Sequence, residues 1–330
     1  MLSNSKPKII FIVGCTASGK GTVGRALAEK MNADILSVDS MKVYKYMDIG
    51  TAKPDIEIRS RIPHHLIDVT DPSEPFSAGR FVDLAQQAIN QRNIPKRHDR
   101  EGVQELPQNR PIIAIGGTVL YLKALTEGLF EGPAANPAVR QQLQQKADQL
   151  GQDYLHQELY RIDPETADRL HRNDLKRIIR ALEVYHLTGK PISSLQKQFG
   201  QLRTDYDMLF LGLRQEKEEL NRRIAERVRR MVRRGLVEEV RTLYERTPPM
   251  SPQARDAVGY AEIIEHFKEK WDLPVALEKV KVNTRRLAKM QRTWFRRLPH
   301  IHWFDIEPQT DPEKTIKLVE EKIEPWLADP

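Results

Sequence analysis

The chain has a single cysteine among its 330 residues, which excludes a disulfide framework and a zinc site built from cysteines. No apolar run approaches the roughly 20 residues that a membrane-spanning helix needs. The apolar run near the N-terminus, Ile9–Val13, is too short to form the core of a secretion signal. These absences predict a soluble protein that works in a reducing, cytoplasmic setting. Because nothing in the sequence indicates an obligate oligomer, we expect a monomer.

Acidic residues are in the minority. The 46 aspartates and glutamates are outnumbered by 53 lysines and arginines, and the resulting net charge of +7 favours a polyanionic partner. Hydrophobic residues make up 39% of the chain, which is enough for the core of one large domain or of a domain that carries an insertion.

The most specific motif is a glycine-rich loop after the first apolar run. It reads GCTASGKGT and joins a predicted strand, Ile9–Val13, to a predicted helix, Thr22–Asn32. The backbone N–H groups of such a loop and the N-terminus of the following helix form an anion cradle, to which Lys20 adds a charge for the outer phosphates. The sequence therefore predicts a site for a di- or triphosphate. Its contacts are Gly14, Thr16, Ala17, Ser18, Gly19, Lys20, Gly21 and Thr22.

This loop departs from the common pattern directly after Lys20, where Gly21 stands in place of the serine or threonine that binds Mg²⁺. The hydroxyl comes one residue later, so Thr22 is the candidate ligand for a Mg²⁺ cofactor. A later predicted strand, Ile112–Ile115, runs into two glycines instead of the aspartate with which phosphate-loop NTPases hold their metal. These departures argue for a leaving group other than that of ordinary γ-phosphoryl transfer.

Residues 8–125 alternate between predicted strands and helices, which is typical of a parallel sheet flanked by helices. Residues 96–110 are strongly polar and are predicted to be a surface insertion. Residues 126–198 are predicted to form a mainly helical insertion domain, which leaves residues 1–125 and 199–330 as a phosphate-loop catalytic core with C-terminal helices. The predicted fold class is thus α/β, similar to phosphate-loop NTPases.

Two polar residues follow strands of this predicted sheet. Catalytic groups gather at the carboxyl ends of parallel strands, and both Asp39 and Thr118 lie there. Asp39 could accept a proton from a nucleophile, hold Mg²⁺ through water, or cap the helix that follows. Thr118, after two glycines, could donate a hydrogen bond to a substrate or be a plain turn residue.

A basic helix is predicted over Lys281–Leu298. Its helical spacing places four cations on one face and four apolar side chains on the opposite face, towards the core. The cations are Arg285, Lys289, Arg292 and Arg296, and the apolar residues are Leu287, Met290, Trp294 and Leu298. No acidic residue interrupts this segment, so the basic face matches a nucleic-acid backbone, although a merely solvated basic face is the alternative.

A second arginine-rich helix is predicted over Leu220–Val240. Four apolar residues follow one side of it, namely Leu220, Ile224, Val228 and Met231, and seven arginines surround them. One of these arginines could turn towards the phosphate site, but spacing alone does not choose it.

Taken together, these motifs resemble the tRNA dimethylallyltransferases, also called tRNA isopentenyltransferases, over nearly the whole chain. The motifs that carry the resemblance are GCTASGK at 14–20, SVDS at 37–40 before Tyr44, MDIGTAKP at 47–54, PHHL at 63–66, GGT at 116–118 before Leu120 and Tyr121, RALEV at 180–184, VGY at 258–260 and TRRLAK at 284–289.

The resemblance implies transfer of the dimethylallyl group from dimethylallyl diphosphate to N6 of the adenosine 3′ of the anticodon, position 37, in tRNAs that read codons starting with U. It implies that Asp39 is the general base, that Thr118 binds the diphosphate or the bridging oxygen, and that Arg223 neutralises the leaving group with Lys20. The helical insertion would lie over the tRNA channel. The implied tRNA contacts are Ser40, Lys42, Tyr44, His64, His65, Tyr121, Gly259, Tyr260, Arg285, Lys289, Gln291 and Arg292.

The chain departs from this family at two further positions. Lys42 stands where many members have glutamine, and Met290 replaces an arginine on the predicted buried side of its helix. Three other functions remain open from the sequence. They are transfer to a free adenine nucleotide, phosphorylation of a small molecule, and binding of tRNA without catalysis.

Overall fold

The computed structural model describes residues 6–91, 97–99, 102–104, 110–130, 132–196, 200–308 and 310–328. The chain divides into two compact units, one made of Met1–Leu125 with Thr204–Pro330 and the other of Thr126–Arg203. The predicted insertion domain, residues 126–198, falls within the second unit. In the part of the chain that the structure describes, no helix has both the length and the apolar character needed to cross a bilayer.

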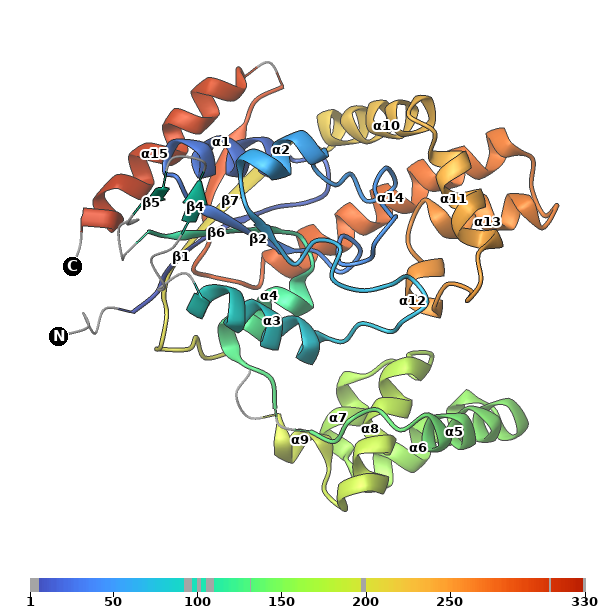
Figure 1. The fold of residues 1–330 in the computed structure, drawn as a ribbon. Helices are drawn as coiled ribbons and strands as arrows, with labels where there is room; N and C mark the ends of the chain where they lie inside the picture. Colours follow the sequence, from blue (N-terminus) through green and yellow to red (C-terminus); the bar gives the residue numbers. More distant parts are fainter. Residues whose placement is uncertain are drawn as a thin grey trace. The chain divides into compact units, whose positions relative to one another are not determined.

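A six-stranded parallel sheet forms the centre of the first unit (Figure 1), with strand order β3-β2-β6-β1-β7-β8. The α/β fold class predicted from the sequence is confirmed. The sequence pattern does not predict β3, which has only two residues, or β8, which follows a region predicted as helix and loop. The strands are β1 (Lys8–Val13), β2 (Asp34–Val38), β3 (His64–His65), β6 (Ile112–Gly116), β7 (Asp207–Gln215) and β8 (His302–Ile306).

One face of the sheet packs against α1 (Lys20–Lys30) and α15 (Pro312–Ala328). Because side chains alternate along a strand, Ile10 and Ile12 both point to this face, where they join Leu27 of α1 and Val319 of α15 in one buried cluster. The central strand is apolar on both faces, as expected for a parallel sheet that is covered on both sides.

The opposite face packs against other helices. Phe11 of β1 stacks on Phe210 of β7 with ring centroids 4.7 Å apart. Figure 1 shows α3 (Ala78–Gln91) and α4 (Val119–Glu127) on the side of the strands away from α1 and α15. Phe81 of α3 stacks on Tyr121 of α4 at 4.3 Å, which joins these two helices.

The C-terminal half of the first unit is mostly helical. Its helices are α10 (Lys217–Arg233), α11 (Leu236–Glu245), α12 (Pro252–Arg255), α13 (Tyr260–Phe267) and α14 (Leu273–Phe295), and a short α2 (Ile56–Arg61) precedes β3. The predicted single helix Leu220–Val240 is wrong, because Gly235 takes a φ of 95° and separates α10 from α11. That left-handed conformation favours glycine and ends a helix.

Helix α14 begins eight residues before the predicted start and ends at Phe295. Its predicted buried side is wrong, since Met290 is 57% exposed and Trp294 is 38% exposed. The residues that α14 buries are Ala276, Val280, Ala288 and Phe295. The prediction gave weight to large apolar side chains, whereas small Ala288 allows the helix backbone to approach the glycine-rich loop closely.

The second unit is a bundle of α5 (Pro137–Leu150), α6 (Gln152–Ile162), α7 (Pro164–Arg169), α8 (Leu175–Thr188) and α9 (Ile192–Leu195) around a separate apolar core. Its buried carboxylate, Glu183, accepts hydrogen bonds from Arg140 and Arg180 and from the backbone N–H of Asn136. Burial alone would raise the pKa of Glu183, but these hydrogen bonds outweigh burial and hold it below its usual range. The carboxylate therefore fixes α8 to the start of α5.

Within the predicted polar insertion, 96–110, β4 (Arg97–Asp99) and β5 (Gly102–Gln104) pair in antiparallel fashion. Most of the remaining insertion lies outside the described residues.

Candidate active site

The glycine-rich loop connects the end of β1 to the start of α1. A Cβ atom at Gly14 would come within 2.7 Å of the Leu213 carbonyl oxygen, so only glycine fits there. Gly19 takes a φ of 95°, which lets the chain turn directly into α1 at Lys20. The Lys20 ammonium folds back over the loop and donates to the Cys15 carbonyl at 2.9 Å. Strand, loop and helix thus have the arrangement that an anion cradle requires, and phosphate binding by these residues stays a prediction.

Three cations surround one carboxylate beside this loop. Burial, together with the charges of Arg227 and Lys42, lowers the pKa of Lys20 to about 8, although Asp39 opposes this shift. Burial also lowers the pKa of Lys42 and of Arg227, and Asp39 again opposes the shift in both. The positive charge here exceeds what one aspartate neutralises, so the site favours a ligand with several negative charges.

Asp39 and Thr118 lie at the carboxyl ends of neighbouring strands, β2 and β6. One carboxylate oxygen, Oδ1, accepts hydrogen bonds from the backbone N–H groups of Met41 and Lys42 at 2.9 and 3.3 Å. The Thr118 hydroxyl accepts from the Ser40 N–H at 3.0 Å and donates to the Ser40 hydroxyl at 3.4 Å. Asp39 is therefore held by a turn of its own loop, and Ser40 joins that turn to Thr118.

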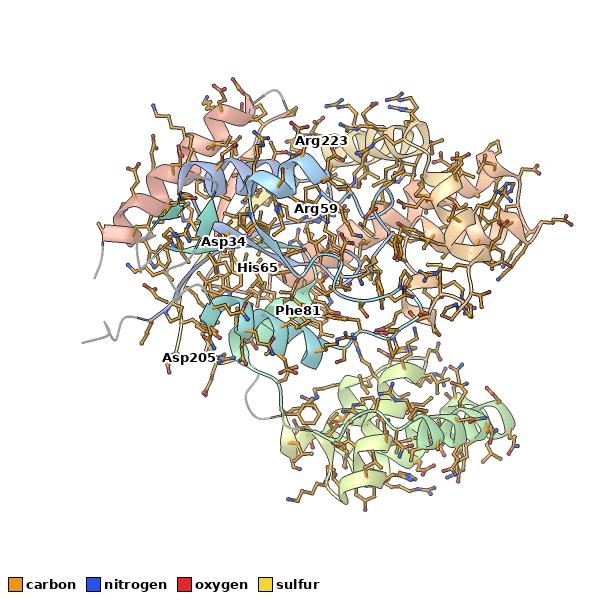
Figure 2. All side chains as sticks on the ribbon, viewed as in Figure 1. Asp34, Arg59, His65, Phe81, Asp205 and Arg223 are labelled. Atoms are coloured by element: carbon orange, nitrogen blue, oxygen red, sulfur yellow. The ribbon has the colours of Figure 1, made fainter. Side chains whose placement is uncertain are left out.

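Helix α10 brings two arginines to the loop. Arg223, shown on α10 in Figure 2, donates to Glu219 at 2.7 Å, and its Nη1 lies 3.9 Å from the place of a Cβ at Gly19. Arg227 donates to the Thr16 hydroxyl at 3.3 Å. Arg227 is a site residue that the sequence alone does not distinguish from the other arginines of this segment. Its position four residues after Arg223, on the same helix face, was the available signal.

Helix α14 is fixed to the loop by Gln291. The Gln291 Oε1 atom accepts from the Thr16 N–H at 2.8 Å, and its Nε2 donates to the Gly117 carbonyl at 2.9 Å. The Cys15 thiol adds a contact to the Ala288 carbonyl at 3.3 Å. Gln291, expected to touch tRNA, thus joins the two glycine motifs of the site.

The three tyrosines implied as tRNA contacts are all buried. The Tyr44 hydroxyl donates to the Gln253 side chain at 3.3 Å, and the Tyr260 hydroxyl donates to Glu239 at 2.6 Å. Glu239 also accepts the backbone N–H groups of residues 48–50. Tyr121 packs on Phe81, as described above. Their contact with tRNA stays a prediction, and the structure gives all three a role in holding loops and helices together.

The two histidines are half-buried. His64 Nδ1 donates to the Ile62 carbonyl at 2.6 Å, and burial lowers the His64 pKa to about 4, so the ring is neutral at pH 7. His65 lies beside Asp34, with Nε2 3.0 Å from the carboxylate (Figure 2). Gly259 is buried and caps α13 with a φ of 99°. These residues also support the structure around the site.

The basic face of α14 is less uniform than the sequence predicts. Arg285 forms an ion pair with Glu278, one turn before the predicted helix start, at 3.3 Å. Lys289 is exposed. The charge of Arg292 opposes the rise in the Cys15 pKa that burial causes, which places Arg292 close to the glycine-rich loop.

The loop does not fit a protein-bound Mg²⁺ of the phosphate-loop type. Gly21 carries no hydroxyl, and the side chain of Thr22 is exposed on α1. Among the described residues there is also no group of three or more histidine, cysteine, aspartate or glutamate side chains that could hold a metal. Thr22 as a metal ligand stays a prediction that this geometry does not favour.

The fold and the site define a phosphate-loop protein that gathers cations around a single aspartate. The chain belongs to the IPP transferase family, whose model matches residues 42–298. It is 44% identical over 316 residues to the tRNA dimethylallyltransferase of Geobacillus thermodenitrificans, covering 95% of this chain and 94% of the relative. It is 42% identical over 311 residues to that of Geobacter metallireducens, covering 94% of this chain and 96% of the relative.

Solved structures agree with this membership. The tRNA isopentenylpyrophosphate transferase of Bacillus halodurans is 36% identical, with a TM-score of 0.68 over 98% of both chains. A eukaryotic dimethylallyltransferase acting on tRNA is 28% identical, with a TM-score of 0.74 over 96% of this chain and 80% of the other.

Proposed function

We propose that this protein is a tRNA dimethylallyltransferase. It transfers the dimethylallyl group of dimethylallyl diphosphate to N6 of adenosine 37, next to the anticodon, in tRNAs that read codons starting with U. The observation that carries this proposal is the group of Lys20, Lys42 and Arg227 around Asp39 at the mouth of the glycine-rich loop. These residues combine an anion site with one candidate base.

In the proposed reaction the adenine N6 attacks C1 of the donor, the C1–O bond breaks, and diphosphate leaves with its negative charge. The loop N–H groups, Lys20, Arg227 and Arg223 stabilise this charge as it develops. The N6 proton passes to Asp39. Because Oδ1 already accepts two backbone N–H groups, we assign the proton to Oδ2. Thr118, held by Ser40, positions the bridging oxygen.

The acceptor is tRNA in this proposal. Lys289 and Arg292 on α14 supply cations for its backbone, and adenosine 37 must leave the stacked anticodon loop to reach Asp39. We place the protein in the cytoplasm, where its substrate is found, and expect it to act as a monomer. Since the residues do not fit a resident Mg²⁺, we assign Mg²⁺ to the substrate, as a counter-ion that arrives with the diphosphate.

The test is to incubate the purified protein with dimethylallyl diphosphate, Mg²⁺ and unmodified tRNA carrying adenosine 37, and then to analyse nucleosides by mass spectrometry. We expect N6-dimethylallyladenosine from tRNA and no product from AMP in a parallel reaction. Asp39→Asn keeps the size of the side chain and removes the base, so it should bind tRNA normally and form no product. Product from AMP alone would reassign the acceptor, and full activity of Asp39→Asn would remove Asp39 as the base.

A further inference from the structure

The first turn of α1 contains a feature that the proposed reaction has not used. Gly21 stands where phosphate loops carry their metal-binding hydroxyl, and Arg25 follows one helical turn later. Residues four apart lie on the same helix face, and helical side chains lean towards the N-terminus. A Cβ at Gly21 would lie only 3.1 Å from Nη1 of Arg25. The guanidinium therefore lies over the place where the usual hydroxyl would be.

The charge of Arg25 faces the same site. Burial lowers the pKa of Lys42, and the charge of Arg25 contributes to lowering it further. Burial likewise lowers the pKa of His64, and Arg25 contributes there too. Arg25 thus lies near the loops that follow β2 and precede β3, on the side of α1 that faces Lys42.

Arg25 is also available for a ligand. No hydrogen bond or ion pair holds its guanidinium among the residues that the structure describes. Burial lowers the pKa of Arg25, and Asp55 opposes this shift. However, Asp55 forms its ion pair with Arg234, at 2.6 Å. A half-buried arginine that has no hydrogen-bond or ion-pair partner among the described residues can donate hydrogen bonds to the oxygens of a phosphate bound nearby.

We propose that Arg25 is a diphosphate-binding residue of this enzyme and that its guanidinium takes the place of the hydroxyl-bound Mg²⁺ of ordinary phosphate loops. The proposal rests on the function proposed above. The absence of a side chain at Gly21 leaves room for the guanidinium, so we expect Gly21 and Arg25 to act together. The consequence is that the protein needs no metal ligand of its own, and that diphosphate binds even when it brings no Mg²⁺.

The first test is calorimetric titration of the full chain with inorganic diphosphate, in EDTA and again in Mg²⁺. We expect the unchanged protein to bind in EDTA with an affinity comparable to that in Mg²⁺. Arg25→Ala should weaken binding in EDTA about 10- to 100-fold, the effect of losing one charge-assisted hydrogen-bonding group. Lys30→Ala removes an equal charge from the exposed end of the same helix and should change affinity by no more than about twofold.

Two results would overturn this proposal while leaving the proposed function intact. One is Arg25→Ala with unchanged diphosphate affinity and a normal circular dichroism spectrum. The other is binding by the unchanged protein that requires Mg²⁺. Failure of the unchanged protein to bind diphosphate in either buffer is a different outcome, because it removes the donor site itself and the proposed function with it.

The second test uses Gly21→Ala, whose methyl group would press on the guanidinium. We expect Gly21→Ala to weaken diphosphate binding by the wild-type protein. In the Arg25→Ala variant it should have little further effect on affinity, because both substitutions remove the same contact. An equal loss in both backgrounds would show that Gly21 acts independently of Arg25 and would overturn the pairing.

Discussion

The arginines of α10 differ in what they contact: some pair with glutamates of the same helix, and Arg227 contacts the glycine-rich loop. Arg222 and Arg229 are exposed, and each is paired with a glutamate of the same helix, at 2.7 and 2.9 Å. Hydrogen bonds from Arg222 and Arg223 lower the pKa of Glu219 to about 2. Arg227 instead faces the glycine-rich loop, and burial lowers its pKa. Counting arginines therefore overstates the charge offered to a ligand, because the helix neutralises most of its own outer face.

Among the cations, the largest effect should come from Lys20 of α1, which faces the same loop as Arg227. Lys20→Ala removes the ammonium that lies over the cradle, and it should lower kcat/KM about 10²- to 10³-fold, as expected for a group that stabilises the leaving diphosphate. Steady-state kinetics with tRNA and dimethylallyl diphosphate measures this loss. A change of less than tenfold would contradict the assignment of Lys20 to the leaving group.

Arg227 and Arg229 give a matched test of the comparison. Arg227→Ala should lower kcat/KM about 10- to 100-fold, because it removes a charged donor at the loop. Arg229→Ala removes an exposed arginine from the same helix and should have almost no effect. Similar losses in both variants would mean that overall charge, and not the direction each arginine faces, decides the rate.

The pH dependence of diphosphate binding should sharpen the comparison further. Since the Lys20 pKa is lowered to about 8, the ammonium is charged below that pH and loses its proton above it. Diphosphate affinity should therefore fall by about tenfold at pH 9, relative to a Lys20→Arg variant whose charge does not titrate there. Titration calorimetry at several pH values measures both proteins. If the diphosphate affinities of both proteins changed equally with pH, Lys20 would be excluded as the titrating group.

The smallest effects should appear on α14. Arg292→Ala should reduce the salt dependence of tRNA binding by a slope of about one, as expected for one lost phosphate contact. Arg285→Ala should change it less, because Glu278 already neutralises Arg285 in part. Filter binding over a range of salt concentrations compares the two. A larger change for Arg285 would reverse the order inferred from these ion pairs.

The phosphate site could be predicted because its chemistry depends on residues that are close together in the sequence. Glycines and a lysine within nine consecutive residues, with a strand before them and a helix after them, specify the cradle. The parallel sheet could be predicted from alternating strands and helices for the same reason. Arg227 could not, because seven arginines occur in one segment and only tertiary packing shows which of them meets Thr16.

The misplaced face of α14 has a similar cause. Helical periodicity shows which residues share a face, but it does not show which face meets the core. Large Met290 and Trp294 were assigned inward, whereas the site needed small Ala288 next to Cys15. The proposed role of Arg25 could not be predicted either, because the sequence shows the missing side chain at Gly21 but not that the Arg25 guanidinium lies over it.

The amide of Gln291 joins α14, the helix that we propose contacts tRNA, to the glycine-rich loop that we propose holds the donor. It connects α14 to the Thr16 N–H and to the Gly117 carbonyl, so α14 cannot move without disturbing the donor cradle. If the anticodon loop prefers one position of α14, the donor's affinity must change by the same factor that the donor imposes on the anticodon loop. Cooperation between donor and acceptor would then be carried by one uncharged side chain.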